Sequence, residues 1–189
     1  MSPITHFLAG WLVANAGRLE RRDRTLVTLA GIAPDADALG VVPEILTRQS
    51  TRPLPWFSEY HHVLAHNLAF GLLIALAVFA LARRRCEAAL LALVSFHLHL
   101  LGDLAGARGP DGYQWPIPYL WPFAPGREWT WGGQWELNAW PNVVFTGAAL
   151  AVTIVLALKR GYSPLEMISS SADRAVVETL RRRFSRGGA

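Results

Sequence analysis

The sequence contains a single cysteine, Cys86, among its 189 residues. One cysteine cannot form an internal disulfide, and it cannot supply the several thiolates of a structural zinc cluster. Any metal that the chain binds must therefore be held by nitrogen and oxygen ligands. The segment Met1–Thr5 also lacks the positive charge and the cleavage site of a signal peptide. We therefore expect the first apolar segment to stay in the mature protein.

Acidic and basic residues are absent from three long apolar runs, which span residues 68–82, 88–101 and 143–158. Each run is shorter than the roughly 20 residues that cross the hydrocarbon core of a bilayer, although flanking Trp, Tyr and Asn residues can complete a span. Hydrophobic residues make up 52% of the chain, and little amphipathic sequence is available to cover three such runs in a soluble fold. We therefore predict an integral membrane protein.

The predicted fold class is all-α, a polytopic membrane bundle of about five hydrophobic helices followed by a cytoplasmic amphipathic helix. The hydrophobic helices are expected at residues 4–16, 25–32, 68–82, 88–102 and 142–158. Pro34 stops the second of them early. Residues 1–162 are expected to form the membrane-embedded, metal-binding domain, and residues 163–189 a basic tail whose helix begins at Ser163 and Pro164. The apolar face of this tail could lie on an anionic membrane surface or against protein.

Basic residues mark one side of the predicted bundle. The exceptions among the 18 are Arg48, Arg52, Arg108 and Arg127. The others lie in the loops after the first, third and fifth predicted helices or in the tail, which carries Arg174, Arg181, Arg182, Arg183 and Arg186. Because cytoplasmic loops collect Lys and Arg, we predict an N-terminus outside and a C-terminus in the cytoplasm. This distribution also indicates membrane lipids as partners and no nucleic acid.

Imidazole and carboxylate groups occur near the predicted outer ends of several helices. These residues are His6, Asp35, Asp37, His61, His62, His66, His97, His99 and Asp103. Such groups are costly in a membrane, so they are candidates for function. The orientation was derived from other residues, so the presence of all these groups at one face independently supports a single site.

The spacing of these residues suits a metal ion. His99 and Asp103 are four residues apart and share a helix face, and Asp35 and Asp37 point to the same side of an extended segment. Neutral imidazole with carboxylate favours one or two divalent ions, zinc first, with manganese or iron as weaker candidates. The candidate ligands are His6, Asp35, Asp37, His61, His66, His99 and Asp103. His97 lies about 200° around its helix from His99, which indicates a structural role.

Several of these motifs occur in an order that resembles a known family. They are Thr5-His6, Ala33-Pro34-Asp35-Ala36-Asp37, His61 with His66, His99 with Asp103, and Trp121-Pro122-Phe123. Over residues 1 to 160 or so, the chain resembles bacterial inner-membrane proteins described as metal-dependent hydrolases, also called LexA-binding inner-membrane hydrolases. The resemblance implies a multi-helix fold in the bacterial inner membrane, a metal centre and a hydrolase activity.

The chain departs from this family next to the second histidine. The family has a His-Arg-Gly opening there, whereas His62 and Val63 follow His61 in this sequence. The family spacing selects His61 and His66 as ligands, while helical spacing would select His62 and His66. We take His61 as the ligand and His62 as the catalytic acid or base, or as a substitute ligand. Asn67 stands where serine is common in the family.

Together these features predict hydrolysis of an ester or phosphoester of a lipid or lipid-linked substrate at the outer face. One alternative is a structural metal that joins short helices, which would have a closed coordination shell. A transporter would need ligands near mid-membrane and a path to both sides, and the inner halves of the predicted helices carry almost no polar groups. Another alternative is a regulatory scaffold that acts through the tail.

Overall fold

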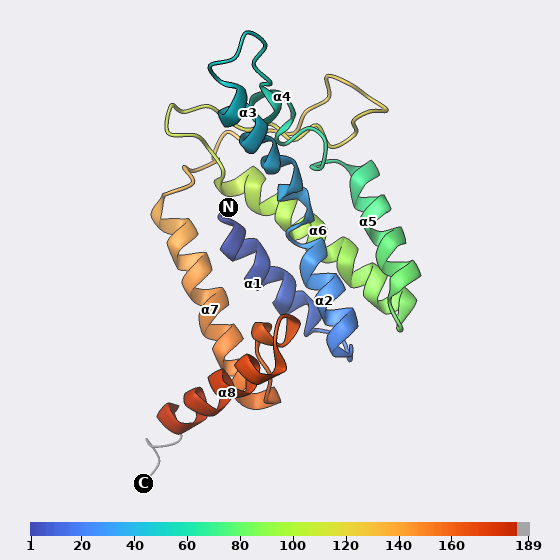
Figure 1. Cartoon of the computed structure of the whole chain (residues 1–189), viewed down its shortest axis with the longest axis vertical. Helices are drawn as coiled ribbons and strands as arrows, with labels where there is room; N and C mark the ends of the chain where they lie inside the picture. Colours follow the sequence, from blue (N-terminus) through green and yellow to red (C-terminus); the bar gives the residue numbers. More distant parts are fainter. Residues whose placement is uncertain (185–189) are drawn as a thin grey trace.

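The computed structural model describes residues 1–184, and its regular structure is helical (Figure 1). The helices are α1 (Pro3–Ala14), α2 (Arg21–Ala30), the 3-10 helix η1 (Ala33–Gly40), α3 (Val41–Thr47), α4 (Trp56–Tyr60), α5 (Leu68–Leu81), α6 (Arg85–Gly106), α7 (Trp140–Arg160), the 3-10 helix η2 (Pro164–Met167) and α8 (Ser170–Phe184). Within residues 1–184 there is no β-strand, only two isolated bridges. The all-α fold class is confirmed. Arg186, predicted in the tail, lies outside the described residues.

Helices α1, α2 and α6 pack against one another, with α5 along α6 and α7 along α1 (Figure 1). Glycines allow the closest of these contacts. A Cβ atom on Gly10 of α1 would lie 2.9 Å from the carbonyl oxygen of Thr28 in α2, and one on Gly31 would lie 2.5 Å from Ser95 Oγ in α6. Small residues at helix interfaces of membrane proteins permit such close backbone approach. The three helices therefore form the centre that positions the candidate site.

Helix α2 starts at Arg21, four residues before the predicted Thr25, and a buried acidic residue, Asp23, lies in its first turn. Asp23 is fully buried, and its carboxylate accepts hydrogen bonds from the backbone N–H groups of Arg83 and Arg84, both at 2.9 Å. This carboxylate satisfies donors in the turn between α5 and α6, and it fixes that turn against α2. At its other end α2 stops at Ala30, ahead of Pro34 as predicted.

Two helices, α6 and α7, are long and apolar enough to cross a membrane. A third span is counted if α2 and the segment Ala33–Thr47 form one span, which is bent by 52° at its break. Helices α1 and α5 are apolar but shorter. The 14 residues of α5 rise only about 21 Å, against a hydrocarbon core of about 30 Å. The structure thus supports a membrane bundle with two or three spans, and it does not establish the five hydrophobic membrane helices that we predicted.

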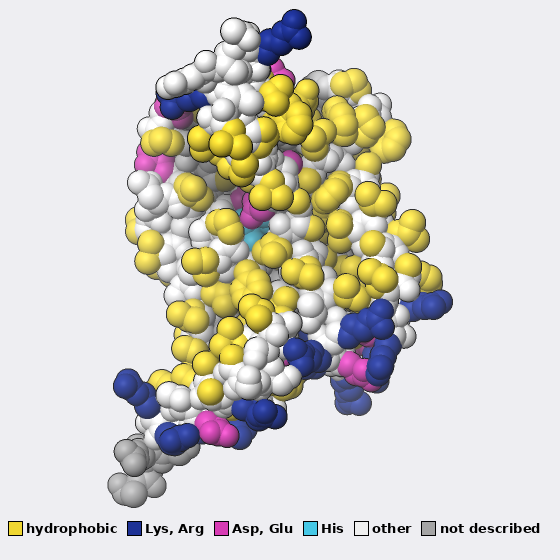
Figure 2. All heavy atoms as spheres, in the orientation of Figure 1, with side chains coloured by type: hydrophobic (Ala, Val, Ile, Leu, Met, Phe, Trp, Pro, Cys, Tyr) yellow, Lys and Arg dark blue, Asp and Glu magenta, His cyan; other side chains and the backbone are white. Residues whose placement is uncertain are grey.

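Apolar side chains cover much of the surface, as the face in Figure 2 shows. On α5, Leu72, Leu73 and Leu76 are more than half exposed, and Val143 at the start of α7 is 67% exposed. Many Lys and Arg side chains gather at the end of the molecule that carries α8 (Figure 2). An exposed apolar surface of this extent is expected where lipid replaces water as the solvent.

The tail folds as two pieces instead of the single helix predicted from Ser163. Ser163 caps η2 as its side chain accepts from the N–H of Leu165, and α8 begins afresh at Ser170. The chain turns between them because both the backbone N–H and the hydroxyl of Ser163 donate to Asp173, at 2.6 and 2.7 Å. The predicted apolar face is interrupted in consequence, with Ile168 left 84% exposed and Val177 buried instead.

A buried ion pair joins η2 to α2. The guanidinium of Arg24 donates to both carboxylate oxygens of Glu166, at 2.7 and 2.6 Å, and it lies 4.0 Å from the centre of the Tyr162 ring. Both partners are at least nine-tenths buried. Paired arginine and carboxylate of this geometry are strongly oriented. Of the two placements that the sequence left open for the start of the tail, the structure therefore has the one against protein.

Removing one partner of this pair is expected to destabilise the fold strongly. Glu166→Ala should lower the free energy of unfolding by about 3–5 kcal/mol, because it leaves the Arg24 charge buried without a partner. The measurement is unfolding of the purified protein in detergent. As a control, Glu178→Ala removes the exposed pair with Arg182 and should cost at most about 1 kcal/mol. Equal effects of the two variants would contradict the anchoring role of Glu166.

Candidate metal centre

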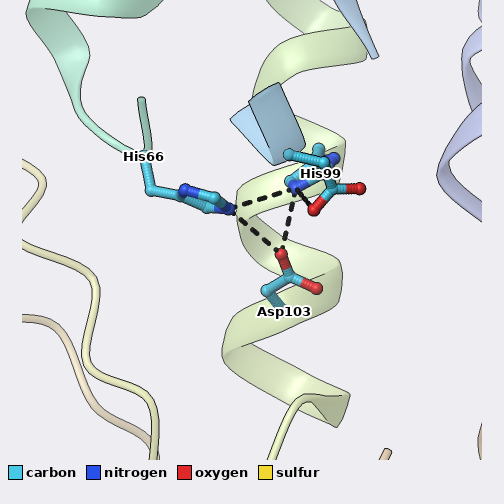
Figure 3. A group of neighbouring side chains, drawn as sticks. His66, His99 and Asp103 are labelled. Carbon is cyan, nitrogen blue, oxygen red and sulfur yellow. Dashed lines mark hydrogen bonds and ion pairs between the residues drawn. The ribbon is translucent and has the colours of Figure 1, made fainter. Parts of the chain in front are cut away.

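Two histidines and two aspartates from three segments meet beside α6. They are Asp35, His66, His99 and Asp103, and one ligand atom from each lies within 4.8 Å of the others. Figure 3 shows His66 pointing toward His99 and Asp103, which lie one turn apart on α6. His99 Nε2 is 3.0 Å from Asp103 Oδ2, 3.3 Å from His66 Nε2 and 3.7 Å from Asp35 Oδ1. The fold therefore brings four of the predicted ligands to one point.

The hydrogen bonds behind the two imidazoles decide which ring nitrogens face this point. His99 Nδ1 lies 2.8 Å from the carbonyl oxygen of Gly31, and His66 Nδ1 lies 3.2 Å from Asp37 Oδ2. Both partners only accept, so each Nδ1 carries a hydrogen and donates it. The two Nε2 atoms then face each other with their lone pairs, beside the carboxylates. A proton on one of them or a metal ion can satisfy this arrangement, and two imidazoles with two carboxylates are a donor set that fits zinc.

The electrostatics of His66 also indicate a cation at this point. Burial favours its neutral form, but the hydrogen bonds and charges of Asp103 and Asp37 outweigh burial and raise the pKa of His66 to about 9. Without metal, His66 therefore holds a proton on Nε2 at neutral pH. A metal ion would have to displace this proton, as is usual when histidine becomes a ligand.

Asp37 and His61, which we predicted as ligands, are not part of the four-residue cluster. Asp37 contacts His66 at Nδ1, the ring nitrogen that does not face the cluster, and His61 contacts Asp37 in turn. The Asp37 carboxylate is 2.7 Å from His61 Nδ1, and it also accepts from the backbone N–H of Ala65 at 3.2 Å. With its bond to His66, Asp37 therefore holds the whole loop before α5. A carboxylate in this position orients a metal-binding histidine and raises its basicity.

His6 lies on the other side of His99. Its ring stacks on the His99 ring with centroids 3.7 Å apart, and its Nε2 is 3.0 Å from Asp103 Oδ1. The amino group of Met1 contacts the same oxygen. Gly102 makes room for the ring, since a Cβ atom there would lie 3.1 Å from His6 Cε1. His6 thus holds the outer oxygen of Asp103, while the inner oxygen faces the four-residue cluster.

His62 lies between the cluster and open space. Its backbone has a φ of 67°, which is uncommon for a residue other than glycine. Its ring is buried against that of His66, with centroids 4.2 Å apart, and its Nδ1 has no hydrogen-bond partner among the described residues. Burial and the charge of His66 lower the pKa of His62 to about 2, so the ring is neutral. Because residues 61–67 form a turn and not a helix, helical spacing does not make His62 a ligand.

A cavity of about 640 Å³ opens beside the cluster and is lined by both Asp35 and Asp103. His62 forms another part of its wall, together with Trp115, whose ring centroid lies 4.8 Å from that of His62. Arg108 lines the cavity as well. The sequence analysis did not single out Trp115, and it placed Arg108 only among the four basic residues on the predicted outer side. The available signal for Arg108 was its place in the chain directly after the Asp103 helix.

His97 is outside this cluster, as its position on the helix predicted. Its Nδ1 donates to the carbonyl oxygen of Leu93 at 2.7 Å, and its Nε2 is 2.9 Å from the hydroxyl of Tyr119. These bonds tie α6 to the loop that follows it. His97 therefore has a structural role and is a suitable control residue for experiments on the site.

Comparison with known proteins identifies the family. A profile of the YdjM inner membrane protein family matches residues 1–174. The chain belongs to this family. The match confirms the resemblance seen in the sequence, and together with the candidate spans it supports a membrane location. No curated protein and no solved structure matches the chain significantly.

Substitutions in the four-residue cluster should reduce zinc binding more than a substitution of Asp37, which only contacts a cluster residue. His99→Ala and Asp103→Ala should each abolish stoichiometric zinc in the purified protein, because each removes a ligand atom of the cluster. Asp37→Asn should weaken zinc affinity by about 10- to 100-fold, since it alters only the partner of His66. His97→Gln should leave affinity unchanged. The measurement is elemental analysis with zinc titration against a chelator, and full zinc content in His99→Ala would refute the site.

Proposed function

We propose that this YdjM-family protein is a metal-dependent hydrolase that acts on an ester or phosphoester of a lipid or lipid-linked substrate. The observation that carries the proposal is that Asp35 and Asp103 belong both to the four-residue cluster and to the wall of the 640 Å³ cavity. A substrate in this cavity would therefore be in direct reach of an ion held by the cluster. In addition, Asp35 Oδ2 is buried without a hydrogen-bond partner among residues 1–184, as expected for an oxygen that would be satisfied by a bound ion.

A second hollow supports a substrate with an apolar chain. This groove, of about 580 Å³, is lined by Pro3, Ile4, Phe7, Leu29, Ile32, Ala33, Asp35, Ala36 and Leu39. It shares Pro3 and Asp35 with the cavity. Ile4 and Leu39 are 65% and 71% exposed, so the groove faces the surroundings of the bundle. Figure 2 shows an acidic side chain and a histidine at the bottom of a hollow in this apolar face. An amphiphile could thus place its chain in the groove and its polar group in the cavity.

The residues around the cluster have distinct roles in the proposed reaction. His66 and His99 would hold a divalent ion through Nε2, with Asp35 and Asp103 as oxygen ligands. Such an ion supplies a Lewis acid for the scissile group and for the attacking water. His6 and Asp37 keep Asp103 and His66 in place. His62 forms part of the cavity wall, where its neutral ring could hydrogen-bond a water or the leaving group.

The proposal includes the orientation predicted from the sequence. In that orientation the N-terminus lies outside, the C-terminus lies in the cytoplasm, and the site opens on the extracytoplasmic side of the inner membrane. Most basic side chains visible in Figure 2 lie at the end of the molecule near α8, whereas the hollow lies away from that end. This separation supports a cytoplasmic tail at residues 163–189 and a catalytic domain at residues 1–162.

A structural metal is the second candidate, and burial favours it. The side chains of His66 and His99 are fully buried, and Asp103 is nearly so. Four protein ligands could fill a tetrahedral shell. In that case the ion would join η1, α6 and the loop before α5 and would do no chemistry. Turnover by the metal-loaded protein separates this candidate from the hydrolase.

The hydrolase proposal predicts turnover that depends on both the metal and His62. Zinc-loaded protein in dodecyl maltoside should hydrolyse at least one of 4-nitrophenyl butyrate, bis(4-nitrophenyl) phosphate and dioctanoyl phosphatidic acid. His62→Gln should lower kcat by about 100-fold or more with zinc content unchanged, the usual effect of losing an acid–base group. His97→Gln is the control on the same helix as the ligands. Stoichiometric zinc without turnover of any of these esters would instead identify a structural metal.

The apolar groove predicts selectivity for long chains. Leu39→Trp should fill the groove and raise KM for a long-chain substrate by about 10-fold, equivalent to roughly two methylene groups displaced from apolar contact. KM for the matching short-chain substrate should not change. Leu76→Trp, an equally apolar and exposed position on α5, serves as the control. If Leu39→Trp and Leu76→Trp gave the same KM values, the groove would have no part in substrate binding.

A further inference from the structure

Arg108 has a side chain that the fold itself does not use. Its backbone N–H donates to the carbonyl of Trp135 and its carbonyl accepts from the N–H of Leu137, both at 3.1 Å. These bonds fix the start of the loop after α6. The side-chain Nε, by contrast, is buried and has no hydrogen-bond partner among the described residues. The Arg108 guanidinium also forms no ion pair with a carboxylate of residues 1–184.

Arg108 as a whole is half-buried, and a buried N–H group such as its Nε is costly without a partner, because it loses water and gains no hydrogen bond in return. Arg108 lies in the wall of the cavity that also contains Asp35 and Asp103. Asp111 lines the same cavity, but its Oδ1 accepts from the backbone N–H of Tyr113 at 3.1 Å. The half-buried Arg108 side chain therefore borders the space in which the substrate of the proposed function would lie, without a carboxylate partner among residues 1–184.

The charge of the cluster determines whether Arg108 is needed to attract an anionic substrate. Asp35 and Asp103 together carry two negative charges, which offset those of one divalent ion. A site that is nearly neutral gives little attraction to an anion. Among the described residues that line the cavity, Arg108 is the only Lys or Arg side chain. The Met1 amino group and the Asp111 carboxylate, which also line the cavity, carry opposite charges. Arg108 therefore adds a net positive charge, and its planar fork matches the oxygens of a phosphate.

We propose that Arg108 binds a non-bridging phosphate oxygen of the substrate, so that the site selects phosphoesters over neutral carboxylic esters. This inference rests on the proposed function and narrows its substrate class. A carboxylic ester can accept a hydrogen bond from the guanidinium through its carbonyl oxygen, but it has no negative charge to pair with Arg108. A phosphomonoester or phosphodiester supplies both the charge and several acceptor oxygens, and hydrogen bonds to charged groups are the stronger ones.

The test measures binding of inorganic phosphate to the full chain. Protein in dodecyl maltoside is loaded with one equivalent of zinc, freed of excess metal and titrated calorimetrically with phosphate or with acetate. We expect phosphate to bind more tightly than acetate, and Arg108→Gln to weaken phosphate binding by about 10- to 100-fold, as for loss of a charged hydrogen bond. Arg108→Lys should recover part of this loss, because it restores the charge but not the fork.

Arg127→Gln is the matched control, since Arg127 is exposed and lies outside the walls of the cavity. Its phosphate affinity should equal that of the unaltered protein. Zinc content and thermal unfolding of each variant show whether it is folded, and Arg108→Lys provides a second test if Arg108→Gln is not. Equal phosphate affinity in the unaltered protein and in a folded Arg108 variant would overturn the inference, as would acetate binding as tightly as phosphate.

Binding of two further compounds distinguishes a phosphate on a lipid from a phosphate on a soluble molecule. Dioctanoyl phosphatidic acid and glycerol 3-phosphate carry the same phosphomonoester with and without acyl chains. Tighter binding of the lipid, lost in part in Leu39→Trp, would support a lipid headgroup at Arg108, whereas equal binding would support a soluble phosphomonoester.

The inference and the proposed function can fail separately. Zinc-dependent turnover of 4-nitrophenyl butyrate that Arg108→Gln leaves intact, together with unchanged phosphate binding, would remove the role of Arg108 and keep the hydrolase. Failure of the unaltered protein to bind zinc would remove the hydrolase regardless of Arg108.

Discussion

An ionised carboxylate inside an apolar helix bundle persists only if nearby groups replace the water that it has lost. Asp103 is in this position, with 3% of its surface exposed. The imidazoles that surround it are His6, His66 and His99, at 3.0, 3.5 and 3.0 Å. They come from α1, from the loop before α5 and from α6 itself. The arrangement of these helices depends on this contact, because each must approach Asp103 closely enough to bring its histidine into range.

A set of backbone and carboxylate acceptors around the imidazoles keeps the centre in one geometry. The Gly31 carbonyl fixes His99 and the Asp37 carboxylate fixes His66, so the facing nitrogens are oriented before an ion arrives. The bend of 52° between α2 and the following segment brings Asp35 to the same point. Ligands that are already oriented lose little conformational entropy on binding, which suits either catalysis or structural stabilisation. The adjoining cavity, which a closed structural centre would not need, favours catalysis.

Two spaces adjoin the centre, and they differ in the charged side chains that they contain. The cavity carries Asp35, Asp103 and Arg108, while the groove is lined almost wholly by apolar side chains. The two spaces meet at Pro3 and Asp35. For the proposed hydrolase, this division matches a substrate with a charged group and a hydrocarbon chain.

The sequence by itself determined the all-α class, the family, the absence of thiolate ligands and a site built from imidazole and carboxylate. Composition, charge distribution and motif order are properties of the chain alone, and they need no knowledge of how the helices pack. Only the tertiary structure decided how many helices could span a membrane, and that the start of the tail lies against α2. It also decided which histidines meet in the four-residue cluster. His61 and His62 are neighbours in the chain and both line the cavity, yet only His61 bonds to Asp37, while the backbone of His62 has a positive φ and its ring stacks on that of His66. Such differences arise from backbone turns and helix rotations that depend on contacts between distant segments, and spacing along the chain does not encode them.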